Sequence, residues 1–217
     1  MLLLLGSMAT TGGFAQNNSI GNNDPEAKKI LDQISNKIKS YHSVQAGFEL
    51  KIEDAKGNLE GTKKGVVYMK GIKYRVTISG QDIFCDGKNI WTYDKSANEV
   101  TVTKFDPSSN SITAQKLFTN FYDKDFLYKL NGSQKHGNKM LQEIEMTPVD
   151  KTKNFFKIYL YVDNTAKTVV SSKMLDKSGN KYTYTINNLN GNAQLSDATF
   201  TFDKTKYPGV EVVDLNN

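Results

Sequence analysis

Apolar and polar residues alternate with a period of two in one segment after another of this chain. Successive side chains of a strand point to opposite faces, so each such segment predicts a strand with one apolar and one polar face. Turn-prone dipeptides such as Asp86-Gly87, Asn131-Gly132 and Asn190-Gly191 separate the segments. The alternation is found at 48–53, 73–79, 100–102, 156–162, 182–186 and 200–202.

This pattern predicts the fold class. It accounts for roughly ten strands, and no βαβ spacing interrupts them. We therefore expect a mainly β protein whose single curved antiparallel sheet forms an open half-barrel.

Two segments have a helical period instead. Asp24-Pro25-Glu26 supplies an N-cap, a proline at the first helical position and an acid in the first turn, which predicts an amphipathic N-terminal helix over Pro25–Ser40. Within 106–130, apolar residues recur at spacings near three and four. We expect one or two short helices there, inserted in the middle of the sheet as a lid over an apolar opening.

The N-terminus predicts export. Residues 1–15 combine an apolar run with small residues and end in Gly13-Phe14-Ala15, as a secretory signal peptide does before its cleavage site. The usual basic start is missing, so the signal is either clipped or begins upstream. A polar leader at 16–23 and one domain at 24–217 complete the expected organisation, with a periplasmic, soluble mature protein.

Composition argues against several classes of function. Basic and acidic residues number 28 and 23 and are interspersed, so we expect no nucleic-acid partner. Cys85 is the only cysteine, and we expect it to be a buried, unreactive side chain. We find no phosphate-binding loop, nucleophile motif or metal-ligand spacing, and therefore predict no enzyme, no metal and no cofactor. A catalytic site assembled only by the fold remains an alternative.

An apolar sheet interior with an aromatic-rich cover suggests a carrier of an apolar ligand. Filling a core is the simpler explanation for any single position. Taken together, however, these positions fit a ligand site, because a half-barrel of this size with a movable cover can hold one ligand.

Three segments resemble one family. The segment 83–94, IFCDGKNIWTYD, followed by EVTV at 99–102, resembles the central hairpin of the periplasmic outer-membrane lipoprotein carriers, the LolA family. SYHSVQAGF at 40–48 resembles the junction between helix and first strand in that family, and FTF at 200–202 with PGV at 208–210 resembles its C-terminal strand and tail. The resemblance spans roughly 25–214.

The resemblance implies a function and a site. It implies a monomeric barrel with a helical lid that binds the acyl chains of lipoproteins. The chains would come from an ATP-driven release complex of the inner membrane and pass to the outer membrane, where a receptor is a further expected partner. The implied acyl-chain-binding residues are Phe48, Leu50, Tyr74, Val76, Ile78, Trp91, Tyr93, Leu117, Phe118, Phe121 and Phe126.

The chain departs from the family at the residue that holds the lid. Family members often carry an Arg-Pro pair before the third strand, where the Arg is implied to bind the lid backbone, but this chain reads Met69-Lys70-Gly71. Lys70 or Arg75 is the expected substitute, although Lys lacks the planar guanidinium fork.

Other functions remain open on the sequence alone. A sensory or regulatory module of the same fold that binds lipids or lipoproteins is the main alternative, and the outer-membrane receptor of the pathway is another. An enzyme would be favoured if His42 or His136 lay beside a carboxylate in a cleft.

Overall fold

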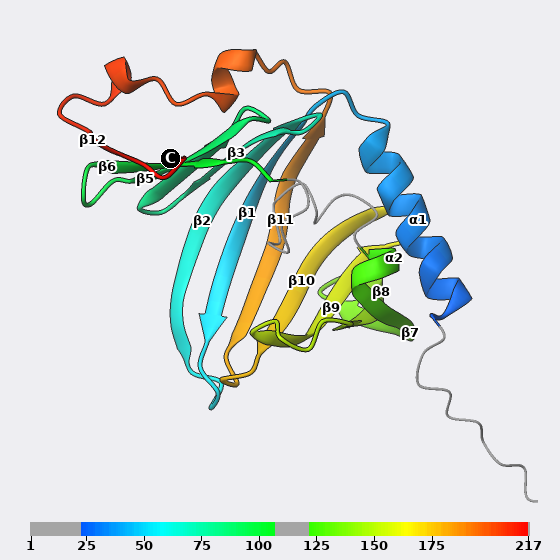
Figure 1. Ribbon diagram of the computed structural model, residues 1–217. Coiled ribbons are helices and arrows are strands. Elements are labelled where there is room, and N and C mark those ends of the chain that lie inside the picture. Colours follow the sequence, from blue (N-terminus) through cyan, green and yellow to red (C-terminus); the bar gives the residue numbers. More distant parts are fainter. Residues whose placement is uncertain (1–22, 107–121, 217) are drawn as a thin grey trace, which may run out of the picture.

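The structure, a computed structural model, describes residues 23–106 and 122–216. Its centre is one curved sheet of twelve strands in the order β12-β6-β5-β4-β3-β2-β1-β11-β10-β9-β8-β7, with a helix along one side (Figure 1). The elements are α1 (Pro25–Lys39), β1 (Val44–Glu53), β2 (Leu59–Lys70), β3 (Lys73–Ile78), β4 (Gln81–Cys85), β5 (Asn89–Asp94), β6 (Glu99–Lys104), α2 (Tyr122–Asp125), β7 (Phe126–His136), β8 (Lys139–Pro148), β9 (Phe155–Asp163), β10 (Thr168–Asp176), β11 (Lys181–Gly191), the 3-10 helices η2 (Asp197–Phe200) and η3 (Lys204–Lys206), and β12 (Glu211–Asp214).

The predicted fold class is confirmed, with one difference at an edge. Every strand pair is antiparallel except that of β12 with β6, which is parallel. A parallel pair needs a crossover connection. The chain after β11 provides it by running across the end of the sheet to reach β6 (Figure 1).

The N-terminal helix is confirmed, and its first residues also bind the sheet. Asp24 Oδ1 accepts hydrogen bonds from the backbone N–H groups of Glu26 and Ala27, as an N-cap does. Asp24 Oδ2 accepts another from the N–H of Leu130 at 2.9 Å, and the Asp24 N–H donates to the carbonyl of Tyr128. Edge strands leave backbone groups unpaired, and here the cap residue pairs two of those on β7. None of the described helices has the length and apolarity needed to span a membrane.

Three local predictions are wrong. The helical segment expected through residue 130 ends at α2, and Phe126 already belongs to β7. No strand forms at 200–202, because η2 ends at Phe200 and the chain then turns toward η3. In β9, a bulge against Leu175 and Asp176 shifts the register, so Phe155 is 5% exposed and Phe156 is 45% exposed. The alternation had predicted the reverse.

Candidate functional site

Cross-strand register divides the side chains of the sheet into two faces. Phe84 lies opposite Trp91 on β4 and β5, whereas the next pair, Cys85 and Ile90, faces the other way. The face that carries Cys85 also carries α1, and we call it the helix face. The face that carries Phe84 is covered over β3 to β6 by the chain after β11, and we call it the tail face.

Helix α1 closes one half of the helix face. Ile30, Leu31 and Ile34 of the helix pack against buried side chains of α2, β7, β8 and β9. Two of these, Ile144 and Met146, have no exposed surface. This half is a packed core, stabilised by about 1.5–3 kcal/mol for each fully buried large apolar side chain.

Polar contacts hold the helix over this core. The Tyr122 hydroxyl donates a hydrogen bond to Asp32 Oδ1 at 2.8 Å, and the Lys28 ammonium lies 3.1 Å from the same oxygen. Burial opposes the charged form of Asp32, but the hydrogen bonds from Tyr122 and Lys28 outweigh it, so the pKa of this carboxyl is lowered. Burial, and then the bond to Asp32, raise the pKa of the Tyr122 hydroxyl. Tyr122 therefore remains a proton donor to Asp32 at neutral pH.

The other half of the helix face, on β1 to β4, has its own smaller cluster. Val44, Met69, Tyr74 and Cys85 are buried in it. Burial raises the pKa of the Cys85 thiol, which keeps it protonated and a poor nucleophile. The expectation of a buried Cys85 is confirmed.

Between the two clusters lies a set of neighbouring side chains on β1 and β11, which we call the central strip: Phe48, Leu50, Tyr182 and Tyr184. Leu50 is buried and the three aromatic residues are partly exposed. The ring centroids of Phe48 and Tyr184 lie 6.2 Å apart. The Phe48 ring also lies over Gly65 of β2, where a Cβ atom would come within 2.4 Å of it. Glycine thus leaves the space that the ring occupies.

Register places five of the predicted binding residues together on the helix face: Phe48, Leu50, Tyr74, Val76 and Ile78. Sequence reasoning missed Tyr182 and Tyr184, which complete the central strip from β11. The sequence shows that they alternate with threonines at 181–186, but it does not show that β11 pairs with β1.

The predicted place of Trp91 and Tyr93 beside these residues is wrong, because both lie on the tail face. The Tyr93 ring centroid lies 4.6 Å from that of Tyr207 and 5.8 Å from that of Phe202. Phe202 and Tyr207 are stacked on each other at 4.5 Å. These rings form a compact aromatic cluster between the sheet and the chain after β11.

The two residues expected to hold a lid have other partners. Lys70 donates a hydrogen bond to the carbonyl of Leu195 and forms an ion pair with Asp197 at 3.1 Å. Arg75 lies over the ring of Phe84, 4.5 Å from its centroid, and forms an ion pair with Asp82 at 3.4 Å. Both side chains therefore bind on the tail face.

Three of the four predicted lid residues, Leu117, Phe118 and Phe121, lie outside the described residues. The fourth, Phe126, is 2% exposed and stacks on Phe155 at a centroid distance of 6.2 Å. Its predicted place in a lid is wrong, since it is part of the core under α1.

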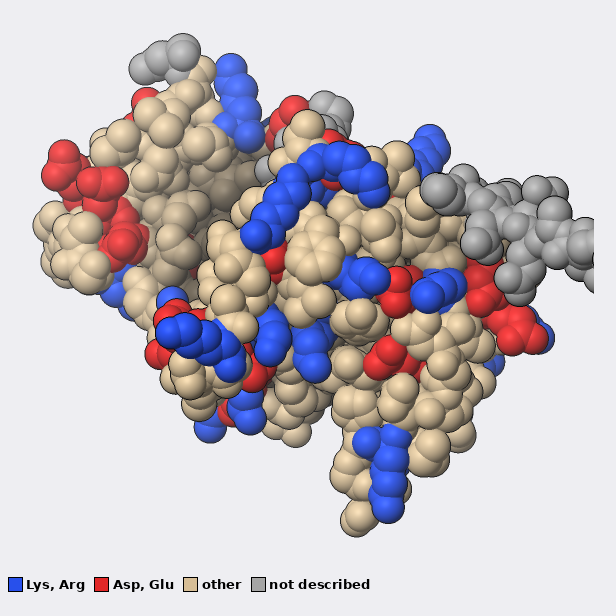
Figure 2. Space-filling view, turned by 90° about the horizontal axis from the view of Figure 1, so that it is seen from below, with Lys and Arg blue, Asp and Glu red and all other residues tan. Residues whose placement is uncertain are grey.

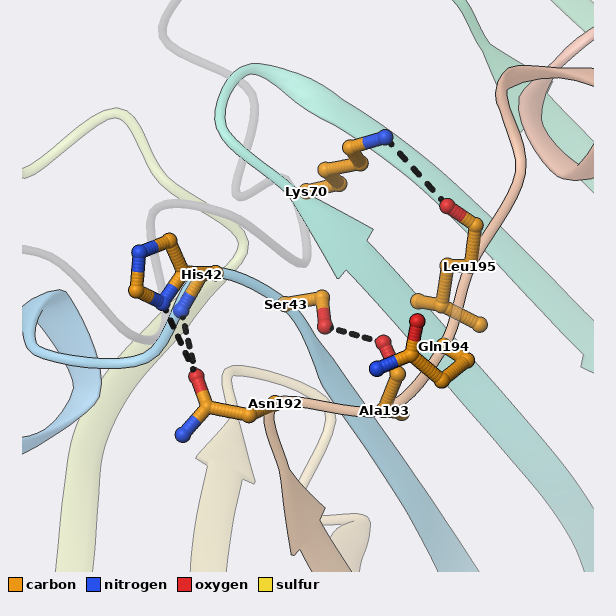
Figure 3. Close-up of a pocket in the computed structure, with 7 residues that line it drawn as sticks. All are labelled: His42, Ser43, Lys70, Asn192, Ala193, Gln194 and Leu195. Carbon is orange, nitrogen blue, oxygen red and sulfur yellow. Dashed lines mark hydrogen bonds between the residues drawn. The ribbon is translucent and has the colours of Figure 1, made fainter.

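A polar hollow of about 240 Å³ lies where β1 begins and β2 ends, beneath the segment that leaves β11 (Figure 3). Asn192 closes one side by accepting a hydrogen bond from the backbone N–H of His42 at 2.8 Å, and Lys70 closes the other by donating to Leu195. Ligand pockets usually measure about 300–1,000 Å³ and are mostly apolar. This hollow therefore does not suit an acyl chain.

The described charges and histidines form no recognisable catalytic arrangement. Acidic and basic side chains are interspersed on the face seen in Figure 2. The ring Nδ1 of His42 lies 3.3 Å from an amide oxygen of Asn192, and the His136 ring lies against Tyr161. Within 23–106 and 122–216, no three His, Cys, Asp or Glu side chains are grouped to hold a metal ion.

Sequence comparison finds relatives that share one description. The chain is 27% identical over 190 residues to an outer-membrane lipoprotein carrier protein of Cupriavidus necator, covering 84% of this chain and 87% of the relative. It is 30% identical over 134 residues to a protein of that description from Ralstonia nicotianae, covering 61% of this chain and 59% of the relative.

A structural comparison supports the fold alone. The crystal structure of an uncharacterized conserved protein from Thermus thermophilus superposes with a TM-score of 0.59 at 14% identity, covering 87% of this chain and 99% of that one.

The sequence model of the family described as outer membrane lipoprotein carrier protein LolA matches residues 39–203. The chain therefore belongs to the LolA family.

Proposed function

We propose that this protein is a periplasmic carrier that binds the acyl chains of lipoproteins and moves them from the inner to the outer membrane. An ATP-driven release complex of the inner membrane would load the carrier, and an outer-membrane receptor would be the further partner. Membership of the LolA family and the names of its relatives support the carrier role. The apolar, uncharged segment at the N-terminus supports export.

The observation that carries the proposal is the central strip. It is an apolar surface that remains partly exposed between two packed clusters on one face of a curved sheet. Each CH₂ group of an acyl chain removed from water contributes about 0.8 kcal/mol. A partly open strip would shield a chain only in part, which suits a carrier that must also release its cargo.

Burial separates the predicted residues into two groups. Phe48, Val76 and Ile78 are partly exposed and can contact a chain directly. Leu50 and Tyr74 are buried. Leu50 is the buried member of the central strip, and Tyr74 belongs to the smaller cluster beside it. Trp91 and Tyr93 have no part in the proposed surface.

A binding measurement with matched variants tests the proposal. The probe is a fluorescent lipopeptide with ester-linked acyl chains on its N-terminal cysteine, and the unacylated peptide is its control. Phe48→Glu places a charge on the central strip, so we expect the affinity for the lipopeptide to fall at least tenfold, because the bound chain would bury that charge.

Thr183→Glu is the matched control. Thr183 lies on β11 one residue before Tyr184, on the tail face, opposite Lys51, and a glutamate there should leave affinity unchanged. Circular dichroism would verify that both variants fold, and Val76→Glu replaces Phe48→Glu if the latter does not. If the wild-type protein bound the acylated and unacylated peptides equally, the carrier function would be wrong.

A further inference from the structure

The central strip contains two tyrosines whose hydroxyl groups differ. The hydroxyl of Tyr182 donates a hydrogen bond to Asp176 Oδ2 at 3.3 Å. The Tyr184 hydroxyl has no hydrogen-bond partner in the part of the chain that the structure describes. Other tyrosine hydroxyls near the packed regions do have partners, such as Tyr93 with Asn98 and Tyr128 with Asp123.

Tyr184 lies in an apolar setting near the middle of the helix face. A cross-strand row joins it to Leu50 of β1 on one side and to Ser172 of β10 on the other. The Ser172 hydroxyl likewise has no partner among the described residues. Phe48 lies next to the tyrosine ring. Two hydroxyl groups with unused hydrogen-bonding capacity therefore lie beside the apolar side chains of Leu50 and Phe48. Lys63 of β2 ends the apolar part of this row on the far side of Leu50.

A ligand that covers the strip displaces water from the Tyr184 hydroxyl. The hydroxyl then has no hydrogen-bond partner unless the ligand supplies one. A polar group that loses water without a replacement bond costs about 1–3 kcal/mol. Burial, and then the neighbouring Tyr182, raise the pKa of Tyr184, so the group remains a neutral donor throughout the physiological pH range. Its best partner is an uncharged acceptor that arrives on an otherwise apolar ligand.

An acyl group has this chemistry. Its chain is apolar, and its carbonyl oxygen at the head accepts hydrogen bonds, whereas an alkyl chain in ether linkage has no carbonyl. We infer that Tyr184 donates a hydrogen bond to the carbonyl of a bound acyl chain and so selects ester- or amide-linked chains over ether-linked ones. This inference rests on the proposed carrier function and names the part of the cargo that the strip recognises.

The test compares two variants and two probes. Tyr184→Phe removes the hydroxyl alone, and the control Tyr93→Phe removes a hydroxyl on the tail face that is already bonded to Asn98. The probes are the diacyl lipopeptide with ester links and the same peptide with ether-linked alkyl chains of equal length. For the ester probe we expect Tyr184→Phe to weaken binding about fivefold, the worth of one net hydrogen bond, and Tyr93→Phe to leave it unchanged. Neither variant should alter the affinity for the ether probe.

The outcomes distinguish a failure of the proposed Tyr184 hydrogen bond from a failure of the proposed carrier function. Equal loss of both probes in Tyr184→Phe, or no loss of either, overturns the carbonyl contact while the carrier function stands. Failure of the wild-type protein to bind either probe overturns both. The midpoint of denaturant unfolding provides a further check: it should be the same in Tyr184→Phe and the wild type, and a clear decrease would assign the hydroxyl a structural role instead.

Discussion

The two faces of β3 to β5 are both rich in large apolar side chains, but they are packed differently. On the tail face, Phe84 and Tyr93 are covered by Phe202 and Tyr207 from the chain after β11, with ring centroids 4.6–5.8 Å apart. On the helix face, the smaller cluster on β1 to β4 is buried, the central strip beside it is partly exposed, and α1 packs against the other half of the sheet. Aromatic content therefore does not identify a binding surface, because what covers each face decides whether it is core.

This difference separates effects on stability from effects on binding. A truncation on the tail face should destabilise the protein and leave the central strip intact. A change on the helix face near Phe48 should affect both properties, since the same residue packs against the sheet and lines the proposed surface.

The largest effect is expected for Phe84→Ala. Phe84 is 3% exposed and contacts both Phe202 and Arg75. The cavity and the lost apolar contact should lower the free energy of unfolding by about 3–5 kcal/mol, as buried Phe→Ala changes do. Denaturant unfolding measures the loss, and the affinity for the acylated lipopeptide, measured where the variant is folded, should equal that of the wild type.

Phe156→Ala is the control for this truncation. Phe156 is 45% exposed, so removing its ring should change the free energy of unfolding by less than about 0.5 kcal/mol. If Phe84→Ala reduced lipopeptide binding as strongly as Phe48→Glu, the assignment of separate roles to the two faces would be wrong.

Gly65→Ala should have an intermediate effect on both the free energy of unfolding and the affinity for the lipopeptide. A Cβ atom there would lie 2.4 Å from the Phe48 ring and 2.5 Å from the carbonyl oxygen of Thr77. Relieving these contacts costs about 1–3 kcal/mol and displaces the Phe48 ring, so lipopeptide affinity should fall as well. Gly61→Ala is matched to it, because Gly61 is on the same face of the same strand and has nothing within 4 Å of the added Cβ. Equal behaviour of the two variants would contradict the close packing of Phe48 on Gly65.

Much of the fold could be predicted from local patterns. The cap at Asp24 and the helical spacing after it predicted α1 to within one residue of its end. The alternation at 48–52 and 74–78 predicted which of those side chains share a face. These features depend on neighbours in sequence, so the sequence displays them directly.

The errors concern features that depend on distant residues. Nothing near Trp91 indicates that Phe202 and Tyr207 return to cover its face. The bulge at Phe156 arises from the register with Leu175 and Asp176 on the next strand. The central strip needs β11 beside β1, although 127 residues separate the end of β1 from the start of β11. A period of two shows that a strand has two faces but does not say what lies on each.

The smallest effect is expected where α1 joins the edge of the sheet. Bonds to backbone N–H groups, that of Leu130 first, lower the pKa of Asp24 against the opposing effect of its burial. A lowered folded-state pKa stabilises the protein above the unfolded pKa of about 3.9, and this stability is lost as the pH falls through the folded value. Asn keeps the oxygen that caps the helix but replaces Oδ2 with an NH₂ group, which cannot accept from Leu130, so Asp24→Asn should cost about 1 kcal/mol at pH 7. Unfolding measured between about pH 1 and pH 7 should show the two proteins converging in acid. A difference that stayed constant with pH would mean that the charge of Asp24 does not hold the helix to β7.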